Sequence, residues 1–417
     1  MAASLRFRLP PPLPFLLLVV CLAVPSTAEA QRAAFRINGS APRIGVLDLA
    51  TGQARDVSND EAQVDASFTS DGRFAVQKVG GGLRVRDMST GATVVLPVDF
   101  RPVVAHPRRA MFFGFTAASE LARLDARGMA RWTPCPGVQV VDSFDLDLDG
   151  AHLYVSCPSR EILVIDSETG LEVRRIGGMP SSRLLAINAA GDLVLVHTDG
   201  AGNTAVDRRD PQTGLLLATR AGLPSWSGTG SRHQLLEFSC TVPPGASCSV
   251  SLIASSSLAP SRALTGGSLP LVMRTYVSPE GREGVFNYVG TSPNTTSVAS
   301  WFDIASGREL GALTLPPGET VEVNVQYPPL PAALAQASVA AGAVALSWQL
   351  PRLSPAAVTY RLEAGLAPGA TAVSIDLGAA ASTTIPGVPP GRYYARIRAV
   401  NYNGVSAPSN EVVIDVP

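Results

Sequence analysis

Three aspartates at alternate positions are the sharpest candidate for chemistry in this sequence. Asp145, Asp147 and Asp149 are followed by Gly150, which matches the first half of a calcium-binding loop. Such a loop needs a bidentate acid at its twelfth position, where this chain has Ser156. Apolar residues alternate with the acids, so the segment also fits a strand that buries leucine, exposes aspartate and ends in an Asp-Gly turn. Both interpretations stay open, and we expect no cofactor other than this calcium.

The histidines show no recognisable catalytic or metal-binding pattern. None lies in an H-E-x-x-H motif, and no two have the spacing of metal ligands. The chain also lacks the G-x-S-x-G of serine hydrolases and the phosphate-binding P-loop. We therefore interpret all four as structural residues with satisfied hydrogen bonds; they are His106, His152, His197 and His233.

Residues 1–30 are typical of a secretory signal peptide. Arg6 and Arg8 precede an apolar run from Leu13 to Val24, and Ala28-Glu29-Ala30 is a cleavage site that leaves Gln31 as the mature N-terminus. The run is shorter than the roughly 20 apolar residues that span a membrane. We predict a secreted or periplasmic bacterial protein that is not inserted in the membrane after cleavage.

Four cysteines remain after cleavage, and an even number suggests disulfides in an exported chain. Their spacing is not that of a C-x-x-C zinc motif. In the strand pattern given below, Cys135 begins the innermost strand of one unit and Cys157 ends the next strand. Cys240 and Cys248 flank a turn between two strands. We predict the pairs Cys135–Cys157 and Cys240–Cys248.

A repeated turn signal organises most of the chain. Each copy follows a strand-like run and consists of Asp, two variable residues, Thr or Ser, and Gly. The carboxylate can accept hydrogen bonds from nearby backbone amides, and glycine supplies a positive φ. Full copies lie at Asp48–Gly52, Asp87–Gly91, Asp166–Gly170, Asp210–Gly214 and Asp303–Gly307, a shortened copy at Asp125–Gly128 and a degenerate one near Ser255–Ala259. With a second turn in each interval, such as Asp71-Gly72, the period of roughly 40 residues predicts four-stranded units.

The stretch from Leu148 to Val155, followed by Val164 to Gly170, resembles a repeat of the bacterial β-propellers of the YVTN and quinoprotein-like type. The resemblance implies a seven-bladed β-propeller over residues 31–327. Thr320 to Tyr327 would supply the innermost strand that the first unit lacks, and so remove an open edge. A solenoid is the alternative architecture. This family contains binding proteins, enzymes and scaffolds, so the resemblance does not specify the chemistry.

A different module follows the proline-rich segment Pro328 to Pro331. The run from Pro389 to Asn401, with Ser409-Asn410-Glu411 after it, resembles the end of a fibronectin type III domain. The resemblance implies an immunoglobulin-like β-sandwich over residues 328–417. It places Trp348 in the core and returns the Tyr393 hydroxyl to backbone upstream. We expect this all-β module to fold by itself.

Composition narrows the function. The 417-residue chain has 46% hydrophobic and 16% charged residues and a net charge of −1, so no overall field attracts nucleic acid. We predict an exported, non-enzymatic binding or scaffold protein with a protein or polysaccharide partner. The alternative is a propeller enzyme of the lactonase, lyase or quinone-dependent dehydrogenase type, with its site at the mouth of the central channel. The scarcity of histidine favours the first hypothesis. The oligomeric state is left open.

The turn pattern also predicts where a ligand binds. The uniform turns share one face of the propeller, because alternate hairpins of a meander open on opposite faces. The other face then carries the irregular loops and the crossings between blades, where recognition residues usually lie. The crossings enter the innermost strands, so Glu61, Arg101, Arg183 and Glu319 are predicted to surround the channel mouth. Arg101 and Arg183 would hold an acidic or polar ligand; the alternative is four solvated charges.

Overall fold

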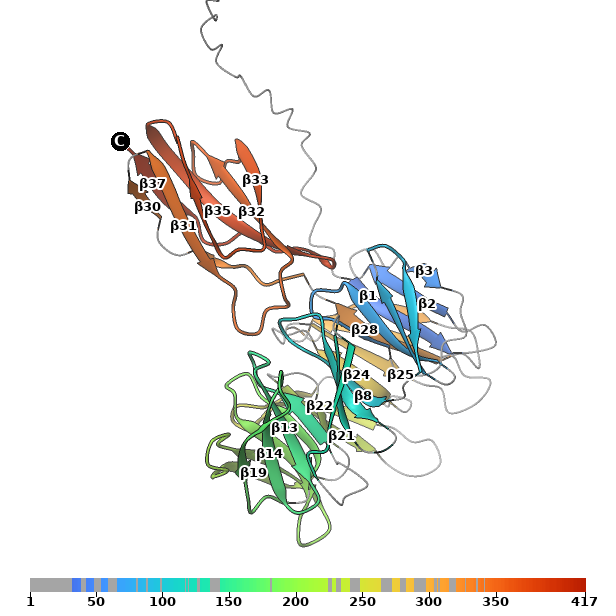
Figure 1. Ribbon diagram of the computed structural model, residues 1–417. Coiled ribbons are helices and arrows are strands. Elements are labelled where there is room, and N and C mark those ends of the chain that lie inside the picture. The colour runs from blue at the N-terminus through green and yellow to red at the C-terminus, as the bar shows by residue number, and fades with distance from the viewer. Residues whose placement is uncertain are drawn as a thin grey trace, which may run out of the picture.

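The protein is described by a computed structural model in which every described element is a β-strand, as predicted. Figure 1 shows a group of small sheets and a separate sandwich. Among the described residues, no helix is long and apolar enough to cross a membrane. The described residues are 32–38, 43–48, 54–58, 66–79, 82–87, 89–97, 100–116, 118, 120–125, 128–135, 143–180, 182–223, 227–229, 234–240, 248–263, 272–277, 283–288, 298–303, 306, 308–314, 320–326, 328–334, 337–340 and 342–417.

The strands between residues 32 and 326 form four-stranded antiparallel sheets that resemble propeller blades. The sheet at the N-terminus contains β1 (Arg32–Asn38), β2 (Arg43–Asp48), β3 (Ala54–Ser58) and β28 (Thr320–Gln326). Each other sheet is a meander of consecutive strands. These are β4 (Ala66–Phe68), β5 (Phe74–Val79), β6 (Gly82–Asp87) and β7 (Thr93–Leu96); β8 (Phe100–Ala105), β9 (Phe112–Thr116), β10 (Leu121–Asp125) and β11 (Gly128–Trp132); β12 (Ser143–Leu146), β13 (His152–Cys157), β14 (Glu161–Asp166) and β15 (Glu172–Ile176); β16 (Ser182–Ile187), β17 (Leu193–Thr198), β18 (Thr204–Arg209) and β19 (Leu216–Leu223); β20 (Ser227–Thr229), β21 (Gln234–Cys240), β22 (Cys248–Ala254) and β23 (Pro260–Ala263); and β24 (Val272–Val277), β25 (Glu283–Tyr288), β26 (Val298–Asp303) and β27 (Arg308–Thr314).

The N-terminal sheet takes its first strand from the far end of this region, as predicted. β28 pairs with β1 over its whole length, from Thr320 opposite Asn38 to Gln326 opposite Arg32. Some first strands of successive sheets contact each other, namely β4 with β8 and β12 with β16. β28 contacts both β4 and β24, so it lies between the first strands of the sheets on either side.

The Asp-x-x-Thr-Gly turns have the hydrogen bonds that their residue types predict. Asp166 Oδ1 accepts from the Thr169 amide and hydroxyl, both at 2.8 Å, and Gly170 adopts a φ of 73°. The same pattern recurs at Asp210 with Thr213. Because these contacts are local, the motif itself accounts for the turn at both positions.

The degenerate turn begins one residue earlier than predicted. The Leu258 amide donates to the Ala254 carbonyl at 2.8 Å, the same bond that Gly170 makes to Asp166. Leu258 takes the position of the glycine, with a φ of 57°. Its side chain is buried, and burial of an apolar side chain offsets the cost of this backbone conformation.

The apolar cores lie between neighbouring sheets rather than within one of them. Phe113 and Leu121, from the sheet β8–β11, pack against Leu146 and Leu163 of the sheet β12–β15. A second cluster joins the sheet β12–β15 to the sheet β16–β19. β12 buries Phe144 and Leu146 in alternation with half-buried Ser143 and Asp145. These two clusters therefore join three successive sheets, β8–β11, β12–β15 and β16–β19.

The C-terminal module is a sandwich of two antiparallel sheets (Figure 1). One sheet contains β29 (Ala333–Leu334), β30 (Ser338–Ala340), β31 (Ala343–Gln349) and β34 (Ser382–Ile385). The other contains β32 (Thr359–Gly365), β33 (Val373–Gly378), β35 (Gly391–Asn401), β36 (Gly404–Val405) and β37 (Val412–Val416). Trp348 is in the shared core, with 4% of its surface exposed, as predicted. The predicted Tyr393 contact is also confirmed, because its hydroxyl donates to the Pro389 carbonyl at 3.0 Å.

Two further features of this module are polar contacts and a packed connection. Arg396 and Arg398 both bind the carboxylate of Glu363, at 2.7 Å and 2.8 Å. The connection from the blade-like sheets is packed against the sandwich. Pro328 and Pro329 are buried, and the Leu330 amide donates to Ser354 Oγ at 2.9 Å.

Candidate binding site at the junction of the blade-like sheets and the sandwich

The residues predicted at the channel mouth are only partly within the described chain. Arg101 lies on β8 and Arg183 on β16, and each is the first strand of its sheet. Both strands have a register shift beside the arginine. Glu61, Glu319 and the side chains of both arginines lie outside the described residues. The grouping of these four residues therefore stays a prediction.

The three alternating aspartates do not converge on one point. Asp145 accepts a hydrogen bond from a backbone amide of β16 at 2.8 Å. Asp147 contacts His152 Nδ1 at 2.8 Å, and Asp149 pairs with Arg352 of the sandwich at 2.7 Å. Across the described ranges, no three His, Cys, Asp or Glu side chains lie close enough together to hold a metal ion. Each of the three carboxylates thus binds a different neighbour.

His106 links two neighbouring sheets in its neutral form. Its side chain is buried, and Nδ1 accepts a hydrogen bond from the Arg108 amide at 2.9 Å. The ring also bonds the backbone of Gly150, where a Cβ would collide with the imidazole. Burial, and then the charge of Arg109, lower the pKa of His106 to about 4. As predicted for the histidines, this side chain serves structure.

Two other histidines contact carboxylates within their own sheets. His197 Nε2 lies 3.4 Å from Asp207 Oδ1, within the sheet β16–β19. Together with the contact between His152 and Asp147, this places two of them beside a carboxylate of their own sheet. His233 lies outside the described residues.

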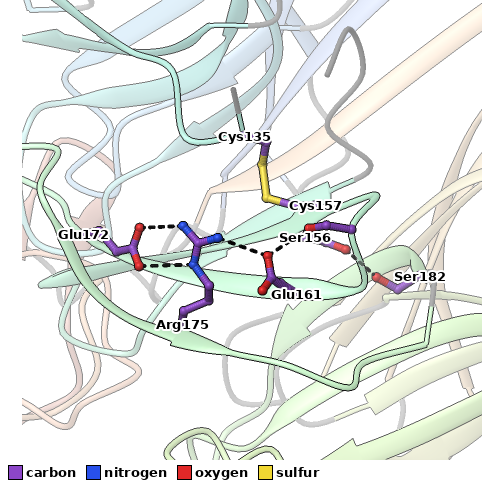
Figure 2. Close-up of a disulfide and its surroundings, with 8 residues drawn as sticks. Cys135, Ser156, Cys157, Glu161, Glu172, Arg175 and Ser182 are labelled. Atoms are coloured by element: carbon purple, nitrogen blue, oxygen red, sulfur yellow. Dashed lines mark hydrogen bonds and ion pairs between the residues drawn. A yellow bond between two sulfur atoms is a disulfide. The ribbon is translucent and has the colours of Figure 1, made fainter. Parts of the chain in front are cut away.

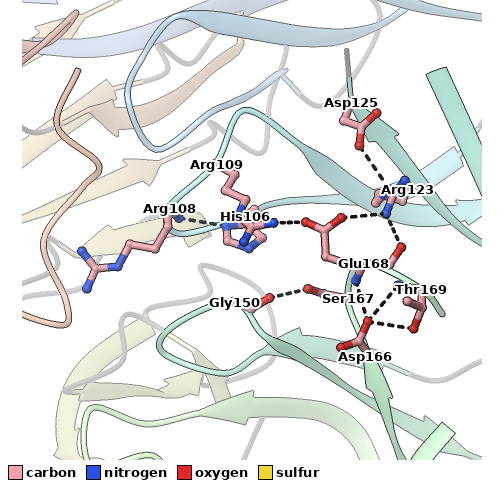
Figure 3. Close-up of polar contacts among 10 residues, drawn as sticks. All are labelled: His106, Arg108, Arg109, Arg123, Asp125, Gly150, Asp166, Ser167, Glu168 and Thr169. Carbon is pink, nitrogen blue, oxygen red and sulfur yellow. Dashed lines mark hydrogen bonds and ion pairs between the residues drawn. The ribbon is translucent and has the colours of Figure 1, made fainter. Parts of the chain in front are cut away.

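A buried arginine ties the turn of one sheet to the strands of the next (Figure 3). Arg123 on β10 lies 3.3 Å from Asp125 and 3.3 Å from the carboxylate of Glu168, which belongs to the β14–β15 turn. It also donates to the Glu168 carbonyl, and Arg109 pairs with the Glu168 carboxylate from the other side. Only 10% of the Arg123 side chain is exposed, so these contacts form in a region of low dielectric.

A disulfide joins Cys135 and Cys157 (Figure 2), which confirms the first predicted pair. Its position differs from the prediction, because Cys135 lies in a bend after β11 rather than at the start of β12. The bond therefore ties the connection between two sheets to the end of β13. The backbone register places Cys240 opposite Cys248. Their side chains lie outside the described residues, so the second pair stays a prediction.

The sandwich contacts the blade-like sheets through the loop between β31 and β32. Arg108, in the β8–β9 turn, donates to the carbonyl oxygens of Pro351 and Arg352 at 3.2 Å and 2.8 Å. Arg352 in turn binds Asp149 of the β12–β13 turn. Leu353 packs against the cluster between the sheets β12–β15 and β16–β19.

A second loop of the sandwich, between β35 and β36, contacts a third turn. The Tyr402 amide donates to the Asp71 carbonyl at 3.0 Å. Gly72 adopts a φ of 74°, and a Cβ there would collide with the side chain of Asn403. All three contacted turns join the first two strands of a sheet, and they are therefore on the uniform-turn face. We call this contact, made by residues 351–353 and 402–403 of the sandwich, the junction.

A cavity of about 320 Å³ opens at the junction. Its walls include Arg108 from the β8–β9 turn, and Trp348, Leu350, Ala356 and Tyr360 from the sandwich. The rings of Trp348 and Tyr360 meet edge to face, with centroids 5.3 Å apart. Burial raises the pKa of the Tyr360 hydroxyl, and the charge of Arg108 acts against this. The cavity thus combines an arginine charge, two polar aromatic residues and aliphatic side chains.

Sequence reasoning missed this site because its parts are far apart in the chain. Arg108 and Arg352 are separated by 244 positions. The one local signal is Leu353, a large apolar residue between Pro351 and Pro355 in a loop. Such a residue has no partner in its own module and indicates a contact with another.

Comparisons by sequence identify no relatives: no family model matches the chain, and no curated protein matches it. Solved structures with a similar arrangement include a putative 6-phosphogluconolactonase from Bacteroides fragilis, at 12% identity over 72% of this chain and 99% of that one, with a TM-score of 0.47. The dihydro-heme d1 dehydrogenase NirN matches at 15% identity over 69% and 74%, with a TM-score of 0.44. The Neurospora crassa Pan2 WD40 domain matches at 10% identity over 69% and 86%, with a TM-score of 0.43. The blade-like interpretation of this chain rests on its own strand order and packing.

Proposed function

We propose that this chain is an exported, non-enzymatic binding or scaffold protein. In this proposal residues 31–327 form a seven-bladed β-propeller and residues 328–417 a fibronectin type III domain, and a protein or polysaccharide is the partner. Residues 1–30 act as the signal peptide and direct the chain to the periplasm or the exterior. Finding Gln31 at the N-terminus of the exported protein would support this part, and an uncleaved chain would contradict it.

The number of blades is supported by the strand order. Seven four-stranded sheets lie between Arg32 and Gln326 in the described part of the chain. β28 completes the first of them and also contacts β24, the first strand of the last sheet. A ring in which the last strand completes the first blade has no free edge to pair with another chain.

The fibronectin type III assignment is supported by two residues and by the two-sheet architecture. Trp348 lies in the core between the sheets, and the Tyr393 hydroxyl binds the backbone four residues upstream. The contact of the Tyr393 hydroxyl is that of a tyrosine corner. β31 alternates buried Val344, Leu346 and Trp348 with less buried positions, as one face of a sandwich requires.

One observation supports the choice of a scaffold: polar side chains between β8 and β19 hold neighbouring sheets together. Arg123 binds the Glu168 turn, His106 binds Gly150, and Arg174 reaches from β15 to the Pro211 carbonyl at 3.0 Å. Such contacts stabilise a rigid ring that presents its loops. The junction meanwhile covers part of the uniform-turn face, which leaves the irregular-loop face for a partner.

The experiment compares binding and catalysis in the same mature protein. Immobilised polysaccharides and candidate exported proteins are tested against the wild-type chain and against the double variant Arg101→Ala/Arg183→Ala. We expect the double variant to lose binding while its melting temperature stays unchanged. Unaltered binding would contradict the role of these arginines. Turnover of a lactone, of an acidic polysaccharide by elimination, or of an alcohol with added quinone would instead support the enzyme alternative.

A further inference from the structure

Two residues that line the junction cavity carry hydrogen-bond donors that no described residue satisfies. The indole Nε1–H of Trp348 is buried and has no hydrogen-bond partner among the described residues. Tyr360 is 7% exposed, and within the same part of the chain no hydrogen bond to its hydroxyl is formed. Buried polar groups are normally paired, so the unpaired indole N–H of Trp348 calls for a partner that the described residues do not supply.

Arg108 brings a charge to the same cavity. Its Nη2 donates to two backbone carbonyls, and no carboxylate of the described chain pairs with it. Arg109, one residue later, is paired with Glu168. The charge of Arg109 is therefore neutralised by a carboxylate. The charge of Arg108 is held in place by neutral carbonyl groups and is not neutralised.

The remaining walls consist of Gln349 and of aliphatic side chains. Leu350, Ala356 and Ala357 line the cavity beside the two aromatic residues. A volume of about 320 Å³ is at the lower end of the range found for small-molecule sites. Three donors with a cationic charge next to an aliphatic and aromatic wall complement one chemical class, an anion attached to a compact apolar body.

We propose that the junction cavity binds a small organic carboxylate. The carboxylate lies between the Arg108 guanidinium and the Tyr360 hydroxyl, and the apolar body lies against Leu350, Ala356 and Ala357. Arg108 belongs to the blade-like sheets and the other residues to the sandwich, so a bound ligand contacts both parts and stabilises the junction. This site is separate from the channel mouth and goes beyond the proposed scaffold function, because it needs neither the ring count nor Arg101 and Arg183.

The test is a titration of the full mature chain with phenylacetate, followed by the indole N–H resonances. The chain has four tryptophans, and the Trp348 signal is assigned by its disappearance in Trp348→Phe. We expect phenylacetate to shift this signal in a saturable manner. Phenylacetamide, which lacks the charge, and acetate, which lacks the apolar body, are expected to bind at least about tenfold more weakly.

Two variants and a matched control locate the site. Tyr360→Phe removes one hydroxyl and leaves every junction contact in place, and we expect about tenfold weaker binding of phenylacetate. Arg108→Gln removes the charge and is expected to weaken binding at least as much. Arg109→Gln makes the same change one residue away and should bind phenylacetate like the wild type.

Three outcomes would overturn the proposal. The first is a Trp348 signal that phenylacetate does not shift at any concentration up to its solubility. The second is unchanged affinity in Tyr360→Phe, and the third is an equal loss of affinity in Arg109→Gln. Each is distinct from failure of the proposed function, which is measured with other partners and with variants at the channel mouth.

Discussion

Two contacts made by the same sheets differ in their chemistry. Between the sheets β8–β11 and β12–β15, large apolar side chains such as Phe113 and Leu146 are fully buried, and a disulfide and the buried Arg123 accompany them. At the junction, Arg352 and Asp149 pair while their side chains are 62% and 55% exposed. Exposed ion pairs contribute at most about 1 kcal/mol, whereas each buried leucine contributes about 2 kcal/mol or more. The comparison indicates a cooperative group of sheets to which the sandwich is attached weakly.

The largest difference in stability between the two contacts is expected from the same leucine-to-alanine substitution made in each of them. Leu146→Ala empties a fully buried position between sheets and should lower the free energy of unfolding by about 2–5 kcal/mol. Leu353→Ala removes a half-buried side chain at the junction and should cost about 1 kcal/mol or less. Urea unfolding followed by tryptophan fluorescence measures both. Equal losses would contradict the distinction between the two contacts.

Removal of the disulfide should have the next largest effect on stability. Cys135→Ser/Cys157→Ser releases a link across 22 positions and should lower the free energy of unfolding by about 2–4 kcal/mol, because the unfolded chain gains conformational freedom. The transition of the sandwich should be unaffected, since the bond lies in the blade-like sheets. Peptide mapping without reductant checks the premise, and a free thiol at Cys157 would refute it.

The folded sheets should become less stable at acidic pH because of His106. The pKa of this side chain is about 4 in the folded protein, against 6.5 as its ordinary value. Between these pH values the unfolded chain binds a proton that the folded chain excludes, so stability falls as pH falls from 6.5 to about 4. The shift corresponds to about 3 kcal/mol. His106→Gln should remove this part of the pH dependence, and an unchanged slope in the variant would argue against it.

The smallest effect on stability is expected when the sandwich is separated from the blade-like sheets. Its core is complete without the blade-like sheets, because Trp348, Tyr360, Leu362 and Ile397 pack within the module. A fragment of residues 329–417 should therefore unfold in one cooperative transition. Calorimetry of the fragment tests this, and a fragment without a transition would show that the junction is needed for folding.

The parts of the fold that the sequence predicted are those with local causes. Asp166 and Gly170 form their turn through contacts within five residues, so the motif predicts the hairpin wherever it occurs. Trp348 and Tyr393 were placed instead by the resemblance to a fibronectin type III domain, and of the two only Tyr393 makes its predicted contact locally, four residues upstream. The degenerate turn was displaced by one residue because Leu258 takes the backbone conformation of the missing glycine.

The candidate site could not be predicted, because its contacts depend on how distant segments meet. Asp149 was interpreted from its neighbours as a strand residue or a calcium ligand, yet it binds Arg352, 203 positions away. Arg108 lies in the β8–β9 turn. Nothing near it in the chain indicates that Trp348 and Tyr360 lie across the same cavity.

The most direct test of the account is amide hydrogen exchange at Tyr402 in the full mature chain. This amide donates to the Asp71 carbonyl across the junction, in a different loop from Arg352 and Leu353. We predict slow exchange in the wild type and much faster exchange in Arg352→Ala/Leu353→Ala, because both loops hold the sandwich on the same face. Exchange at the rate of an unstructured peptide in the wild type, or a rate that the double variant leaves unchanged, would contradict a docked sandwich and the site that it forms.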